Sequence, residues 1–190
     1  CRVAATWPDD LTVAVNLSAR HFQSSDIVQA VGDALAKSGL SANRLEIEVT
    51  ESLLIKNQDE VRSKLEKLRK LGATIALDDF GTGYSSLSHL LKFPFDKIKI
   101  DKSFVDASST DMTARDILRT IAALGSTLEM KVTAEGVETR EQVEFLREIA
   151  CHHLQGYFFA KPLHVSAVAP YLLASAGERL READEGNEER

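Results

Sequence analysis

The chain has 190 residues, of which 44% are hydrophobic and 27% are charged, and this composition predicts a single globular domain with one substantial core. Its net charge of -6 argues against the basic surface with which proteins grip DNA or RNA, so no nucleic-acid partner is expected. The two cysteines form no CxxC pair or disulfide framework, and no apolar run is long enough to span a membrane, so a reducing, cytoplasmic setting is expected.

Six short apolar runs are expected as strands, in chain order. They are residues 12–15, 45–50, 74–77, 97–100, 131–134 and 155–159. Apolar residues at helical spacing predict helices around 27–35, 61–68, 86–91, 117–128, 143–149 and 165–173. Gly39 suits the position just past the end of the first helix. Two capping boxes are expected at helix starts, one from Asn57 and Glu60 and one from Thr139 and Gln142.

The two ends of the chain differ from its middle. The sequence begins without a methionine, and we expect it to be a piece of a longer protein. From about Gly177 the residues are mostly charged or polar, which predicts disorder because there is little to bury. The expected organisation is therefore one domain over 1–175 and a charged tail over 176–190.

Strands and helices alternate along the chain, which predicts an α/β fold with a parallel sheet and crossover helices. Two architectures fit this order: the (β/α)8 barrel and the open doubly wound sheet. No GxGxxG or GxxxxGK[ST] sequence opens a helix, which disfavours the dinucleotide-binding and P-loop versions of the open sheet.

The most informative segment is the pair Asp78-Asp79, which follows the apolar run 73–77 and precedes a glycine-rich turn. Two adjacent carboxylates raise each other's pKa unless a positive charge lies between them. A divalent cation supplies that charge, and a cation that bridges two carboxylates is a common device for hydrolysing phosphate esters. The alternative is an ordinary acidic turn, since Asp and Gly are common turn residues.

Polar residues recur where each expected strand ends. They are Asn16, Glu48, Glu51, Asp78, Asp79, Lys99, Asp101, Glu135, Glu138 and Gln155. In a βα barrel these strand ends converge on the face that carries the active site, and hard oxygen ligands suit Mg²⁺ or Mn²⁺. Taken singly, each residue has an ordinary explanation, such as a turn, a helix start or a solvated strand position. Those explanations do not account for the recurrence.

Six segments match a known family in the right order. They are VNLSARHF (15–22), LEIEVTES (45–52), ALDDFGTGYSSL (76–87), KIKIDKSFV (97–105), TAEGVET (133–139) and QGYFFAKPL (155–163). Through them the chain resembles the EAL domain, a family of phosphodiesterases that hydrolyse cyclic di-GMP to linear pGpG. The resemblance implies a (β/α)8 TIM-barrel-like fold.

The resemblance also implies roles for individual residues. The implied ligands of two Mg²⁺ or Mn²⁺ ions are Asn16, Glu48, Asp78, Asp79 and Glu135. Asp78 would bridge the two ions, and Glu135 would also help activate water. Lys99 would orient or deprotonate the attacking water, and Gln155 would complete the shell. Glu51 would hold the loop 79–85, which in this family is coupled to dimerisation.

One part of the family pattern is absent: the Glu-Ala-Leu triplet, whose Glu is a metal ligand in the family, does not occur in this sequence. We therefore expect a barrel that lacks its first strands, and weak or no activity from these 190 residues alone. The alternative function is a catalytically inactive cyclic di-GMP receptor or interaction module. A homodimer and an upstream cyclase or sensor domain are further expectations that the resemblance implies.

Overall fold

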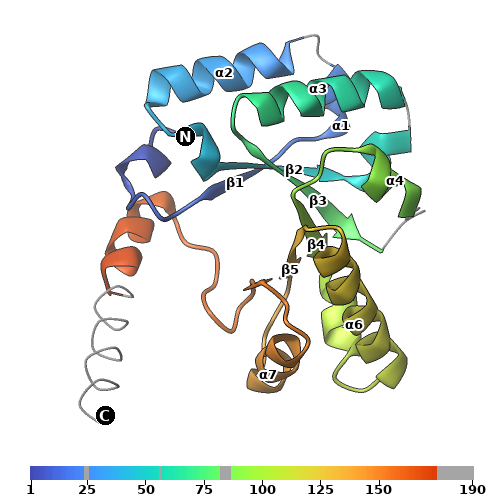
Figure 1. Ribbon diagram of the computed structural model, residues 1–190. Helices are drawn as coiled ribbons and strands as arrows, with labels where there is room; N and C mark the ends of the chain where they lie inside the picture. Colours follow the sequence, from blue (N-terminus) through green and yellow to red (C-terminus); the bar gives the residue numbers. More distant parts are fainter. Residues whose placement is uncertain (24–25, 56, 82–86, 175–190) are drawn as a thin grey trace, which may run out of the picture. The chain divides into compact units, whose positions relative to one another are not determined.

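Six parallel strands form one curled sheet, and each strand pairs with the strands next to it in the sequence (Figure 1). They are β1 (Val13–Asn16), β2 (Leu45–Thr50), β3 (Thr74–Phe80), β4 (Lys97–Ile100), β5 (Lys131–Ala134) and β6 (His153–Leu154). The order runs from β1 to β6 without a reversal, whereas a doubly wound sheet needs one. The fold in this computed structural model is therefore a half-barrel, which confirms the barrel-type α/β prediction.

Helices follow the strands around the outside of the sheet (Figure 1). They are α1 (Ala19–Gln23), α2 (Ile27–Ser38), α3 (Gln58–Lys70), α4 (Leu87–Lys92), α5 (Lys102–Ala107), α6 (Met112–Thr127) and α7 (Arg140–Glu148). Short 3-10 helices are η1 (Ala4–Thr6), η2 (Ala42–Arg44) and η3 (Glu51–Ile55). Within the described residues, none of the helices has the length and apolar character that crossing a membrane requires.

The structure describes residues 1–23, 26–55, 57–81 and 87–174. Most of the glycine-rich turn after Asp79, and the charged tail expected over 176–190, lie outside these ranges. Within the chain, Cys1–Phe159 form one compact unit and Ala160–Arg190 a second. In the second unit, residues 165–174 are helical and mostly exposed, close to the helix expected over 165–173.

The two faces of the sheet differ in chemistry because successive strand residues point to opposite sides. The fully buried side chains Ile47, Ile75, Ile98 and Val132 belong to the hydrophobic core together with helix residues such as Leu65. The alternate positions carry buried polar groups instead. Among them are Glu46, Glu48, Asp78, Lys99 and Thr133. The sheet therefore packs its apolar face on the helices and holds charged groups on the other face.

Three expected strands, 45–50, 97–100 and 131–134, appear with the expected bounds. The capping box of Thr139 and Gln142 is also confirmed, with both of its reciprocal hydrogen bonds present. Gly39 ends α2 with a φ of 70°, in the left-handed region where glycine carries no steric penalty.

Other expectations about the elements were wrong. Asn57 adopts a left-handed φ of 52° and its side chain makes no capping hydrogen bond, so the capping box expected from Asn57 and Glu60 is absent. The last strand is His153–Leu154, not 155–159. Helix α5 was not expected from the sequence.

Candidate active site

Lys99 lies at the centre of a group of carboxylates at the carboxyl ends of the strands. Its Nζ is 2.7 Å from Glu48 Oε1, 3.0 Å from Asp78 Oδ1 and 2.6 Å from Glu135 Oε1. Lys99, Glu48 and Asp78 are all buried, with at most 8% of their surface exposed. Glu48 and Lys99 therefore face each other across β3 and do not point to solvent.

A β-bulge brings the neighbouring carboxylates Asp78 and Asp79 to the same place. On a regular strand they would point to opposite faces. Between Leu77 and Phe80, however, β3 uses one more residue than β4, and Asp79 has a left-handed φ of 54°. As a result, one oxygen each from Asp78, Asp79 and Glu135 lie within 4.8 Å of one another.

The charges of this cluster fit a divalent cation. Four carboxylates (Glu48, Asp78, Asp79 and Glu135) gather around one ammonium group. Asp78 Oδ1 is buried and makes an ion pair with Lys99, but it accepts no hydrogen bond of good geometry. Burial raises the pKa of Asp79, and the charges of Asp78 and Asp101 raise it further. Burial likewise raises the pKa of Glu135. A nearby cation would stabilise the charged form of these carboxylates and so lower the pKa of Asp79 and of Glu135.

Lys99 is held in its charged form. Burial by itself lowers the pKa of this ammonium, but its ion pairs with Glu135, Glu48 and Asp78 outweigh burial and raise the pKa above its ordinary value. In this arrangement the ammonium group donates hydrogen bonds and cannot accept a proton. Its chemistry is therefore to orient and stabilise negatively charged or polar groups.

Comparison with known proteins identifies the family. The family model described as EAL domain matches residues 1–162. The chain belongs to the EAL domain family. It is 46% identical to the cyclic di-GMP phosphodiesterase NbdA of Pseudomonas aeruginosa over 86% of this chain and 21% of NbdA. It thus spans about a fifth of the length of this curated relative.

Solved structures agree with this assignment. The structure of the MucR phosphodiesterase in complex with c-di-GMP, from P. aeruginosa, matches with a TM-score of 0.81 and 41% identity, over 86% of this chain and 68% of that one. The manganese and cyclic di-GMP complex of Klebsiella pneumoniae BlrP1 matches with a TM-score of 0.75 and 36% identity, over 80% of this chain and 39% of that one. The half-barrel is therefore part of an EAL fold.

Asn16 and Gln155 lie at the same edge of this EAL sheet, and both side chains are exposed. Asn16 ends β1 beside Glu48 in the strand register, and its side chain is exposed. The backbone N–H of Gln155 donates to Ala134 O at 2.9 Å, directly after β6, and its side chain is also exposed. In the parts of the chain that the structure describes, neither side chain hydrogen-bonds to the carboxylates. Their roles as ligands stay predictions.

The remaining acidic candidates surround the cluster and have partners of their own. Glu51 Oε1 accepts a hydrogen bond from Gly81 N at 3.4 Å, so it contacts the start of the glycine-rich turn. Asp101 caps α5 by accepting from Ser103 N at 2.9 Å. Glu138 forms an ion pair with Lys102.

Two features of the site were not predicted from the sequence. Lys97 and Glu46 form a second, mostly buried ion pair on the same face of the sheet as Lys99. The charged residues at 46 and 48, and at 97 and 99, alternate with apolar residues, and this alternation could have predicted the pair. The second feature is the side chain of Gln142, which reaches the carbonyl oxygen of Val105 at 3.4 Å in addition to its expected capping bonds. Its position in a capping box gives no indication of that contact.

Proposed function

We propose that this EAL domain hydrolyses cyclic di-GMP to linear pGpG. The observation that carries the proposal is the convergence of Asp78, Asp79 and Glu135 beside the buried ammonium of Lys99. The names of NbdA and of the MucR complex support the choice of cyclic di-GMP as the substrate.

The proposed cofactor is a pair of divalent ions, Mg²⁺ or Mn²⁺. Glu48, Asp78, Asp79 and Glu135 would hold them, with Asn16 from the neighbouring strand. The BlrP1 complex with manganese supports the choice of a divalent ion. Bound in this place, the ions would supply positive charge to the phosphodiester and lower the pKa of a nearby water.

The chain's own residues would orient the reacting groups. Lys99 would donate a hydrogen bond to the attacking water or to developing negative charge in place of one of its three carboxylate partners, once those carboxylates hold metal. Glu135, whose pKa is raised by burial, would accept a proton at its carboxylate. Glu51 would hold the start of the turn through Gly81 N, and Gln155 would complete the polar shell.

The second candidate is a receptor that binds cyclic di-GMP without hydrolysing it. The exposed side chain of Asn16, which hydrogen-bonds to none of the carboxylates in the described residues, favours this candidate, since a receptor need not keep a complete ligand set. A homodimer, a cytoplasmic location and a linked cyclase or sensor domain remain part of the proposal. The name of MucR, a bifunctional diguanylate cyclase and phosphodiesterase, supports a linked cyclase.

Hydrolysis and binding measured on the same sample separate these candidates. The purified chain is incubated with cyclic di-GMP and Mn²⁺, and pGpG is quantified beside the Lys99→Ala variant and a sample in EDTA. We expect slow pGpG formation that needs Mn²⁺ and Lys99. Fast turnover would contradict the expected weak activity of these 190 residues. Binding without pGpG would favour the receptor, and a chain that neither binds nor hydrolyses cyclic di-GMP would refute both candidates.

A further inference from the structure

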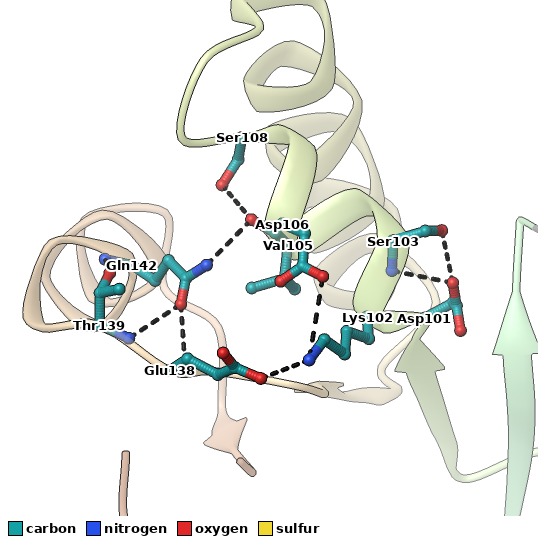
Figure 2. Close-up of polar contacts among 9 residues, drawn as sticks. All are labelled: Asp101, Lys102, Ser103, Val105, Asp106, Ser108, Glu138, Thr139 and Gln142. Carbon is teal, nitrogen blue, oxygen red and sulfur yellow. Dashed lines mark hydrogen bonds and ion pairs between the residues drawn. The ribbon is translucent and has the colours of Figure 1, made fainter. Parts of the chain in front are cut away.

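Gln142 ties the segment after β5 to helix α5 (Figure 2). The segment 135–139, here called the Glu135 loop, connects β5 to α7. Gln142 is 5% exposed, and its Oε1 accepts hydrogen bonds from Glu138 N at 2.7 Å and Thr139 N at 3.0 Å. Its Nε2 donates to Val105 O in α5 at 3.4 Å. One buried amide thus satisfies three backbone groups from two separate segments.

Lys102, from α5, also contacts the Glu135 loop. Its ammonium forms an ion pair with Glu138, and the same group lies 3.9 Å from Asp106 within α5 (Figure 2). Its aliphatic stem occupies the space beside Gly136, where an added Cβ would come within 2.2 Å of Lys102 Cγ. Gly136 also has a left-handed φ of 68°, so the loop is shaped to receive this side chain.

These contacts matter because α5 begins directly after the strand that carries Lys99. Asp101, two residues beyond Lys99, caps α5 and so fixes its start. On the loop side, Glu135 N donates to Ile100 O at 3.1 Å. The distance between Lys99 Nζ and Glu135 Oε1, 2.6 Å, therefore depends on how the Glu135 loop sits against α5.

We propose that Gln142 and Lys102 are positioning residues for the reaction, which set the Glu135 carboxylate against Lys99 and the neighbouring aspartates. Neither side chain touches the reacting atoms. Their effect passes through the backbone of the Glu135 loop, as outer partners of a metal site orient its ligands. The inference rests on the proposed function, since it assumes that Glu135 works at the site.

The test compares three variants by two measurements. Gln142→Met keeps the size of the side chain but loses all three hydrogen bonds. Lys102→Met removes the ion pairs with Glu138 and Asp106 at a half-exposed position. Thr139→Ala is the matched control. It removes the Thr139 Oγ1 acceptor for Gln142 N, at 3.2 Å, but leaves the bonds from the backbone N–H groups to Gln142 Oε1 intact. The measurements are amide hydrogen exchange at Glu135 in metal-free protein and Mn²⁺ binding by electron paramagnetic resonance without substrate.

We expect Gln142→Met to speed exchange at the Glu135 amide and to weaken Mn²⁺ binding, each by about fivefold or more, because it breaks three hydrogen bonds. Lys102→Met should change both in the same direction by about two- to fivefold, the effect of losing an exposed ion pair. Thr139→Ala should change neither the exchange rate nor the Mn²⁺ affinity, although it should lower the melting temperature. Lys102→Arg, which keeps the positive charge, should leave both at the wild-type values. Unchanged exchange in both Met variants, or unchanged Mn²⁺ affinity, would overturn the inference. If Gln142→Met does not fold, Lys102→Met decides. A wild-type chain that takes up no Mn²⁺ would count against the proposed function. The exchange rates at the Glu135 amide, measured without metal, would still test whether Gln142 and Lys102 fix the Glu135 loop.

Discussion

The left-handed backbone of Asp79 is the residue-scale feature that makes the cluster. Without the extra residue in β3, the side chains of Asp78 and Asp79 would point to opposite faces of the sheet. A non-glycine residue at such a φ is uncommon and often marks a functional position. The bulge thus converts an adjacent pair in the sequence into a shared site.

At the same scale, replacing Lys99 should disable the site in a specific way. Lys99→Ala leaves buried carboxylates without their shared partner, which costs about 3–5 kcal/mol of folding free energy. We expect pGpG formation to be lost and cyclic di-GMP binding to fall only modestly. Hydrolysis assays and calorimetry on folded protein measure the two effects. Lys97→Ala is the matched control, because it breaks the neighbouring ion pair with Glu46 and should leave hydrolysis in place. Equal hydrolysis by wild type and Lys99→Ala would refute the assigned role.

Cys151 gives a pH-dependent prediction that is independent of the site. Burial raises the pKa of its thiol from 9.0 to about 11. The unfolded chain therefore releases this proton near pH 9, while the folded chain holds it until about pH 11. Between these two pH values the unfolded state is stabilised relative to the folded state. We expect the free energy of unfolding to fall between about pH 9 and pH 11 by about 2 kcal/mol more in wild type than in Cys151→Ser. Urea titrations under reducing conditions measure this difference. Parallel pH profiles for the two proteins would contradict the prediction.

At the scale of elements, the segment after β6 is fixed by a backbone contact that only glycine permits. A Cβ at Gly156 would lie 2.1 Å from Val137 O and 2.2 Å from Val137 N. We expect Gly156→Ala to lower the free energy of unfolding by about 2 kcal/mol or more, because backbone atoms cannot move aside as a flexible side chain can. The control is Gly32→Ala in α2, where nothing lies within 4 Å and the substitution should stabilise the helix by about 0.5–1 kcal/mol. Urea titration of both variants checks the prediction, and a neutral Gly156→Ala would contradict it.

Elements that depend on local pattern could be predicted, and those that depend on backbone geometry could not. The strands β2, β4 and β5 follow from short apolar runs, and the cap of α7 follows from Thr139 and Gln142. The same pattern failed at Asn57, because its left-handed φ of 52° differs from the extended backbone that a capping residue needs. Helix α5 was missed because it has only six residues, too few for a clear period.

At the scale of the whole sheet, the strand-end rule predicted which charged residues would lie together. It brought together Glu48, Asp78, Asp79, Lys99 and Glu135. It could not show that Glu48 is buried, since alternation with Ile47 and Val49 also suits a strand with one solvated face. Glu48 is buried and contacts the ammonium group of Lys99 in β4, a residue distant in sequence.

The central claim is that the paired aspartates form a divalent metal centre, and Mn²⁺ binding tests it most directly. Electron paramagnetic resonance follows free Mn²⁺ during titration of the purified chain and of its Asp78→Asn variant. The change keeps the shape of the side chain but removes the charge and one carboxylate oxygen. We expect wild type to bind Mn²⁺, and Asp78→Asn to bind it about 10-fold or more weakly. Equal binding by the two proteins, or no binding by wild type, would contradict the account.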